Sequence, residues 1–109
     1  MSKVEPAKIN FREGDVLASK DQNVSVSKIL KIERTPGGDT TFHMWIYQEE
    51  FASLEEARHA YVQKQLHVLV MHAPLDGAAY NAENTSVLGH DPVTDDELEG
   101  YRTFLEMCD

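Results

Sequence analysis

The chain has 109 residues, 41% of them apolar and 27% charged, with one cysteine and a formal charge of -9. This composition is typical of one soluble globular domain, and it excludes a disordered chain or two domains. A single cysteine excludes an intramolecular disulfide and a thiolate zinc site within one chain. No apolar run approaches the roughly 18 residues that span a bilayer, and residues 1–10 lack the apolar core of a signal peptide. We therefore expect a cytoplasmic protein with a loosely ordered lead-in over these ten residues.

Charge is distributed unevenly along the chain. Residues 1–34 carry a balance of +2, whereas residues 35–109 carry fourteen acids and three bases, a balance of -11. Binding to phosphate backbones depends on lysine and arginine, so the balance argues against nucleic acid as a partner. An acidic surface favours encounter with cationic proteins, although charge of this kind also serves solubility alone.

The predicted elements begin with two paired strands. A short strand over residues 16–18 and a second over residues 24–33 are joined by turn residues 21–23, which predicts an antiparallel pair. Alternation in the second strand indicates a sheet with one wet side. Lys28 and Ile29 break this alternation, which predicts either a bulge or a lysine stem along the core edge with its ammonium in water.

A third strand over residues 40–48 follows the clear turn at residues 35–39. Its two faces are both apolar or aromatic: Phe42, Met44 and Ile46 on one side and His43, Trp45 and Tyr47 on the other. This pattern is typical of a central strand covered on both sides, or of a strand with an aromatic contact surface.

The period then changes from that of a strand to that of a helix. Ser53 and Glu56 have capping-box spacing, which predicts a helix over residues 54–65. A fourth strand is predicted over residues 66–71, closed by Pro74.

The last third of the chain ends in another helix. Residues 78–84 predict either one helical turn or a loop, and residues 85–88 a short edge strand. Thr94 and Glu97 repeat the capping-box spacing ahead of a helix over residues 95–107. Its predicted packing stripe comprises Leu98, Tyr101, Leu105 and Cys108, with Phe104 beside it.

Five histidines make a metal site the first enzyme-like hypothesis. They are His43, His59, His67, His72 and His90. No HExxH or similar compact ligand spacing occurs, and His67 and His72 would point to opposite faces of a regular strand. Packing beside Trp45 and Tyr47 therefore explains His43 better than a shared metal ion.

Other catalytic signals have structural explanations. Cys108 falls on the apolar stripe of the last helix, where thiols are usually inert packing groups. Ser53 and Thr94 are explained by capping, and the paired carboxylates by strand exits and first helical turns. Neither GxxxxGK[ST] nor GxGxxG occurs, so Gly37 and Gly38 indicate a turn and not a phosphate cradle.

A contact surface is the remaining candidate for function. The aromatic face of the third strand, with His43, Trp45 and Tyr47, is followed closely by four acids: Glu49, Glu50, Glu55 and Glu56. Together they would form an aromatic anchor with an acidic rim for a protein partner. Two alternatives are that a helix covers this face, or that the face is self-complementary and joins copies in a homo-oligomer.

Three segments carry a resemblance. Residues 11–18, FREGDVLA, running into the valine-rich residues 24–30, resemble the opening of small bacterial immunity-type proteins with a curled, SH3-like sheet. Residues 92–101, PVTDDELEGY, are similar to the tail of functionally uncharacterised small bacterial proteins. The resemblance implies inhibition of a toxin by tight surface binding.

The sequence therefore predicts one α+β domain over residues 1–109. It contains a curved, mainly antiparallel sheet of four or five strands, with a barrel as its closed form, packed by a mid-chain and a C-terminal helix. The predicted function is non-enzymatic binding of a basic protein such as a toxin or nuclease, with no cofactor, metal or membrane. The alternative is a small metal- or ligand-binding enzyme that uses His43, His67 and His72.

Overall fold

The structure is a computed structural model that describes residues 11–80 and 83–107. The predictions for residues 1–10 and for Cys108 lie outside the described residues. In chain order the elements are β1 (Asp15–Lys20), β2 (Val24–Arg34), β3 (Thr40–Phe51), α1 (Leu54–Val62), β4 (Val68–Asp76), η1 (Gly77–Ala79), β5 (Thr85–His90), η2 (Asp96–Leu98) and α2 (Glu99–Met107). Among the described residues, no helix is long and apolar enough to cross a membrane.

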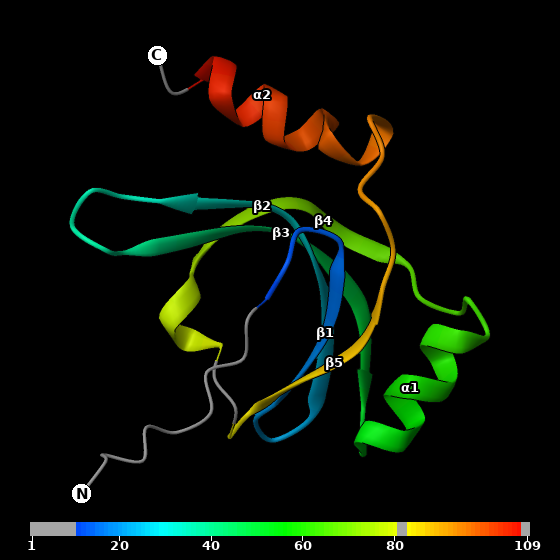
Figure 1. The fold of residues 1–109 in the computed structure, drawn as a ribbon. Helices are drawn as coiled ribbons and strands as arrows, with labels where there is room; N and C mark the ends of the chain where they lie inside the picture. The colour runs from blue at the N-terminus through cyan, green and yellow to red at the C-terminus, as the bar shows by residue number, and fades with distance from the viewer. Residues whose placement is uncertain (1–10, 81–82, 108–109) are drawn as a thin grey trace, which may run out of the picture.

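The strands form one antiparallel sheet in the order β4-β3-β2-β1-β5, which confirms the predicted α+β fold. The sheet curves strongly but stays open, and the two helices pack against it (Figure 1). Pairing between β2 and β3 shifts register between Ser25 and Ser27 and between Ile29 and Lys31. Such irregularities bend a strand, and the second lies beside the predicted break in alternation.

Each face of the sheet carries its own apolar cluster. One cluster joins the sheet to α1 and contains Val16, Ala18, Val24, Val26, Ala57 and Leu88. The other contains Leu17, Ile29, Phe42 and Met44. Lys28 lies opposite Val16 and Trp45 in the strand pairing, so it shares the side of the first cluster. We call this side the helix face, because it carries α1 and, further along β3, α2.

The predicted capping box begins α1. The hydroxyl of Ser53 accepts a hydrogen bond from the backbone N–H of Glu56, and the carboxylate of Glu56 accepts one from Ala52. The helix ends at Val62, earlier than predicted, because Lys64 adopts a φ of 56°. This left-handed conformation ends a helix.

The predicted C-terminal helix forms in two parts, the 3-10 turn η2 and the α-helix α2. Thr94 and Glu97 make both hydrogen bonds of the predicted capping box. The packing stripe differs from the prediction, because Leu105 is 47% exposed whereas Phe104 lies half-buried against the sheet. Contacts with β3 and β4 decide which side of the helix faces inward.

The fourth strand begins and ends later than predicted, and it continues through Pro74. This is possible because β4 lies at the edge of the sheet, where proline's missing N–H removes no bond to a further strand. The edge position also leaves Leu69 and Met71 exposed, at 64% and 52%. The ambiguous stretch after β4 begins with the 3-10 turn η1, and β5 extends beyond the predicted residue 88 to His90.

Candidate functional site

The three predicted aromatic anchors lie on the helix face but differ in access. His43 is 1% exposed, whereas Trp45 and Tyr47 are partly exposed and their rings meet edge to face at 6.4 Å. The imidazole of His43 contacts the ring of Tyr101 in α2, with 4.7 Å between the ring centroids. A helix therefore covers the aromatic face at His43, and this residue is closed to a partner while α2 is docked.

The four predicted acids gather around the entry to α1. Glu50 and Glu55 are exposed, and neither carboxylate has a hydrogen-bond or ion-pair partner in residues 11–80 and 83–107. Glu56 caps the helix, and Glu49 accepts hydrogen bonds from the backbone N–H and Nδ1 of His67. A shallow, open groove lies beside them, lined by Phe51, Ser53, Glu55, Glu56, His59, Ala60 and Gln65. We call it the α1 groove.

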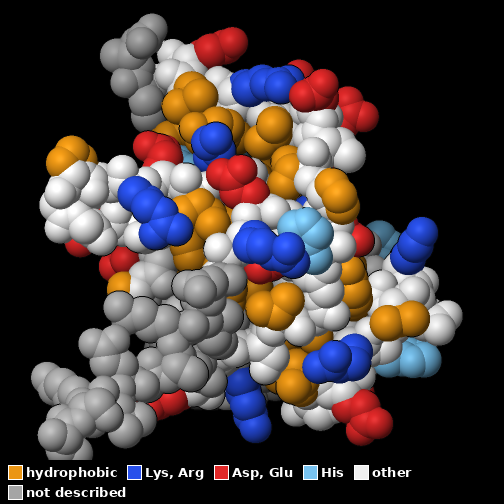
Figure 2. All heavy atoms as spheres, in the orientation of Figure 1, with side chains coloured by type: hydrophobic (Ala, Val, Ile, Leu, Met, Phe, Trp, Pro, Cys, Tyr) orange, Lys and Arg blue, Asp and Glu red, His pale blue; other side chains and the backbone are white. Residues whose placement is uncertain are grey.

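Charge is also segregated on the surface. In Figure 2, acidic side chains gather around α2 at the top, with cationic charge also present there, and cationic side chains with scattered acids cover the rest of the view. This separation follows the sequence, since seven of the ten bases precede residue 35 and fourteen of the nineteen acids follow residue 34. Most of the acids therefore follow β2 in the chain.

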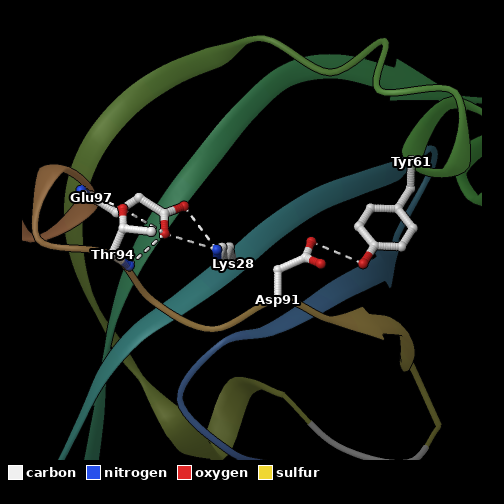
Figure 3. A network of polar contacts seen from close by, with 5 residues as sticks. All are labelled: Lys28, Tyr61, Asp91, Thr94 and Glu97. Carbon is white, nitrogen blue, oxygen red and sulfur yellow. Dashed lines mark hydrogen bonds and ion pairs between the residues drawn. The ribbon is translucent and has the colours of Figure 1, made fainter.

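A buried ion pair joins the sheet to the C-terminal segment. The ammonium of Lys28 lies 3.0 and 2.8 Å from the two carboxylate oxygens of Glu97, and the side chains are 5% and 12% exposed. Figure 3 shows this pair beside Thr94, whose backbone N–H donates to Glu97. The interpretation that placed this ammonium in water is therefore wrong. The sequence signal was the break in alternation at Lys28, but nothing local indicated its partner.

A second polar contact joins α1 to the chain just after β5. The hydroxyl of Tyr61 donates to the carboxylate of Asp91 at 2.9 Å (Figure 3). A Cβ on Gly89 would lie 2.5 Å from this hydroxyl, so the close approach of the ring requires glycine. Burial, followed by the charges of Glu97 and Asp91, raises the pKa of nearby Tyr47 to about 12. Tyr47, Tyr61 and these carboxylates thus form one electrostatically connected region.

Glu33, His43 and His72 form a hydrogen-bonded chain beneath α2. Nε2 of His43 is bonded to the carboxylate of Glu33, and Nδ1 of His43 lies 2.7 Å from Nε2 of His72. The two imidazole planes are nearly parallel, at 13°, and their centroids are 4.9 Å apart. His67 is bonded to Glu49 instead and does not join them. Within the described ranges, no group of three or more His, Cys, Asp or Glu side chains is arranged to hold a metal ion, so the geometry gives the three-histidine alternative no support.

These polar groups satisfy one another between the sheet and the two helical segments. Lys28 pairs with Glu97, Tyr61 with Asp91, and His43 with His72. Each contact ties a strand or helix to a part of the chain distant in sequence. The first two contacts attach the C-terminal segment to the sheet and to α1, and the third joins β3 to β4. The exposed carboxylates of Glu50 and Glu55 have no such role.

Comparison with known proteins adds no family to this description. No protein-family model, curated protein or solved structure matches the chain. The resemblance to immunity-type proteins therefore stays a prediction. The structure defines an α+β protein with an open, five-stranded antiparallel sheet and both helices on one face.

Proposed function

We propose that this protein is a non-enzymatic binding module that captures a more basic protein at the α1 groove. The observation that carries the proposal is a pair of exposed carboxylates without partners in the described part of the chain. Glu55 lines the groove, and Glu50 directly precedes the lining residue Phe51. A carboxylate that no internal cation neutralises is available to a cationic group of another molecule. A basic toxin is the kind of partner that the sequence resemblance implies, and a basic nuclease would fit the same acidic surface.

The composition of the groove supports a cationic side chain as the group that enters it. Phe51 and Ala60 supply apolar lining, and Glu55 and Glu56 supply negative charge beside it. Lysine and arginine combine an apolar stem with a charged end, so both parts would find complementary surface. The overall charge of -9 would add long-range attraction for a basic partner.

Charge reversal in the groove tests the proposal. Wild-type protein, Glu55→Lys and Asp39→Lys would each serve as bait for affinity capture from lysate of the source organism, after circular dichroism has shown that both variants fold. Asp39 is a matched control, because it is exposed in the turn between β2 and β3 and its replacement changes the charge equally. We expect a basic protein that is retained by wild type and Asp39→Lys and lost with Glu55→Lys.

Salt dependence provides the quantitative measurement. For the captured protein, we expect the affinity for wild type to fall by at least tenfold between about 50 and 500 mM salt, because screening weakens attraction between exposed charges. Glu50→Lys should weaken binding in the same direction as Glu55→Lys. The proposal fails if no captured protein distinguishes Glu55→Lys from Asp39→Lys, or if its affinity does not depend on salt.

A further inference from the structure

Two imidazoles form the surface on which α2 rests. No residue of α2 is buried, and its inward rings lie against histidines. The ring centroid of Tyr101 is 4.7 Å from that of His43, and the centroid of Phe104 is 4.5 Å from that of His72. Purely aliphatic packing would hold a helix equally well at any pH. This contact contains titratable groups, so its strength depends on their protonation.

The geometry of the histidine pair limits how many protons it can hold. Nδ1 of His43 and Nε2 of His72 are 2.7 Å apart, so one proton lies between them. In the neutral pair one ring donates and the other accepts, and Nε2 of His43 donates to Glu33. A first added proton can reside on Nδ1 of His72 without disturbing these bonds. A second would place two N–H groups against each other at hydrogen-bond distance.

The surrounding charges can balance one added proton on the histidine pair but not two. Glu33, in β2, is the only carboxylate in the described part of the chain that is bonded to either imidazole. Lys31, opposite His43 in the pairing, adds a positive charge that lies 3.8 Å from Glu13. On the α2 side the pair meets the phenol of Tyr101, and Arg102 is bonded to Asp95. Lys28 and Glu97 neutralise each other.

From this geometry we propose that α2 is an acid-released helix, which leaves the sheet when the His43–His72 pair takes up a second added proton. Two adjacent imidazolium ions repel each other, lose their shared hydrogen bond and displace the rings that rest on them. Glu97 lies in η2, directly before α2 in the chain. Its ion pair with Lys28 can therefore retain η2 on the sheet while α2 leaves.

The direction of the pH effect follows from His72. Burial, and then the neighbouring His43, lower the pKa of His72 from its usual 6.5. A freely exposed histidine therefore takes up protons at a higher pH than the docked one does. The docked state is fully stabilised above pH 6.5 and weakens as the pH falls through the lowered pKa of His72. Release is complete only at the lower pH at which the pair takes up its second proton.

Hydrogen exchange measured by mass spectrometry tests the proposal. Protection factors, corrected for intrinsic exchange, would be compared at about pH 7.5 and about pH 5.0 for amides of α2 and of the central strand β2. We expect α2 to lose at least tenfold in protection at the lower pH, while β2 changes less than twofold. Equal protection of α2 at both pH values, or parallel loss in α2 and β2, would overturn the proposal.

Two variants assign the effect to this histidine pair. His72→Gln retains a side-chain amide that can bond to His43 but cannot titrate, so α2 should stay protected at the lower pH. His67→Gln is the matched control, because His67 lies on the exposed surface and bonds to Glu49. Its α2 should be released as in wild type. Release in His72→Gln equal to that in wild type would contradict the proposal.

Two further measurements cover the case in which His72→Gln loses α2 already at neutral pH. In Gly100→Ala, the new Cβ would lie 2.9 Å from the backbone oxygen of Met71, so α2 should be displaced at any pH. This variant supplies the reference spectrum of the released helix. As the pH is lowered, the NMR shifts of α2 in wild type must move toward that spectrum. The pH midpoint of this change must equal the pH at which the pair takes up its second proton. A different midpoint would overturn the proposal.

Discussion

The two helices are attached to the same face of the sheet by different kinds of contact. α1 buries Ala57 and Ala60, which are 0% and 5% exposed, and Ala57 belongs to the apolar cluster on the helix face of the sheet. α2 buries no residue, and it lies on the imidazoles of His43 and His72. Just before it, the Lys28–Glu97 ion pair ties η2 to the sheet.

This difference teaches how each attachment can be changed. Small apolar side chains bring α1 close to the sheet, and burial of apolar surface does not depend on protonation. The C-terminal segment depends instead on charges and hydrogen bonds. Removing one member of such a pair leaves the other buried without a partner, which is costly. The first attachment should therefore respond to changes in volume, and the second to changes in charge.

The largest expected effect comes from breaking the polar attachment at one partner. Glu97→Leu leaves the ammonium of Lys28 buried without a counter-charge, and we expect the free energy of unfolding to fall by about 3 to 5 kcal/mol. Urea unfolding followed by circular dichroism measures this. The double variant Lys28→Met with Glu97→Leu should recover most of the loss. Equal destabilisation of the single and double variants would contradict this account.

Changing volume under α1 should have an intermediate effect. Ala57 is completely buried, so Ala57→Leu forces extra atoms into a packed cluster and should cost about 1 to 3 kcal/mol. Arg58→Leu, on the exposed side of the same helix, should change stability by no more than about 0.5 kcal/mol. Both variants are measured by urea unfolding at two pH values. If the loss of unfolding free energy in Ala57→Leu varied strongly with pH, the attachment of α1 would not be purely apolar, and the contrast with α2 would fail.

The smallest expected effect lies where the two attachments meet, at Tyr47. Its pKa is raised to about 12, by burial first and then by Glu97 and Asp91, so the folded protein disfavours the phenolate. The stabilisation is present below the usual pKa near 10 and is lost as the pH rises through the raised value. We expect the urea midpoint to decline between about pH 9 and 11, and to decline less in Tyr47→Phe. If the urea midpoint of Tyr47→Phe declines as much as that of wild type, Tyr47 is not the source of the decline.

Much of the fold was predictable because its signals are local. Each capping box joins residues only three positions apart, so Ser53 and Thr94 marked the helix starts directly. The passage of β4 through Pro74 was not predictable in this way, since proline is tolerated there only because no strand pairs with the outer edge of β4. The end of α1 likewise depended on the conformation of Lys64, which carries no turn signature.

The candidate site likewise contains features that local sequence signals predict and features that only tertiary contacts determine. The sequence by itself determined the antiparallel strands, the starts of both helices and the excess of acids after residue 34, because these follow from composition and short-range periodicity. Only the tertiary structure decided that Lys28 meets Glu97, 69 residues away, and that His43 lies beneath α2. Such pairings depend on strand register and on where a helix docks, and both arise from the summed packing of distant segments.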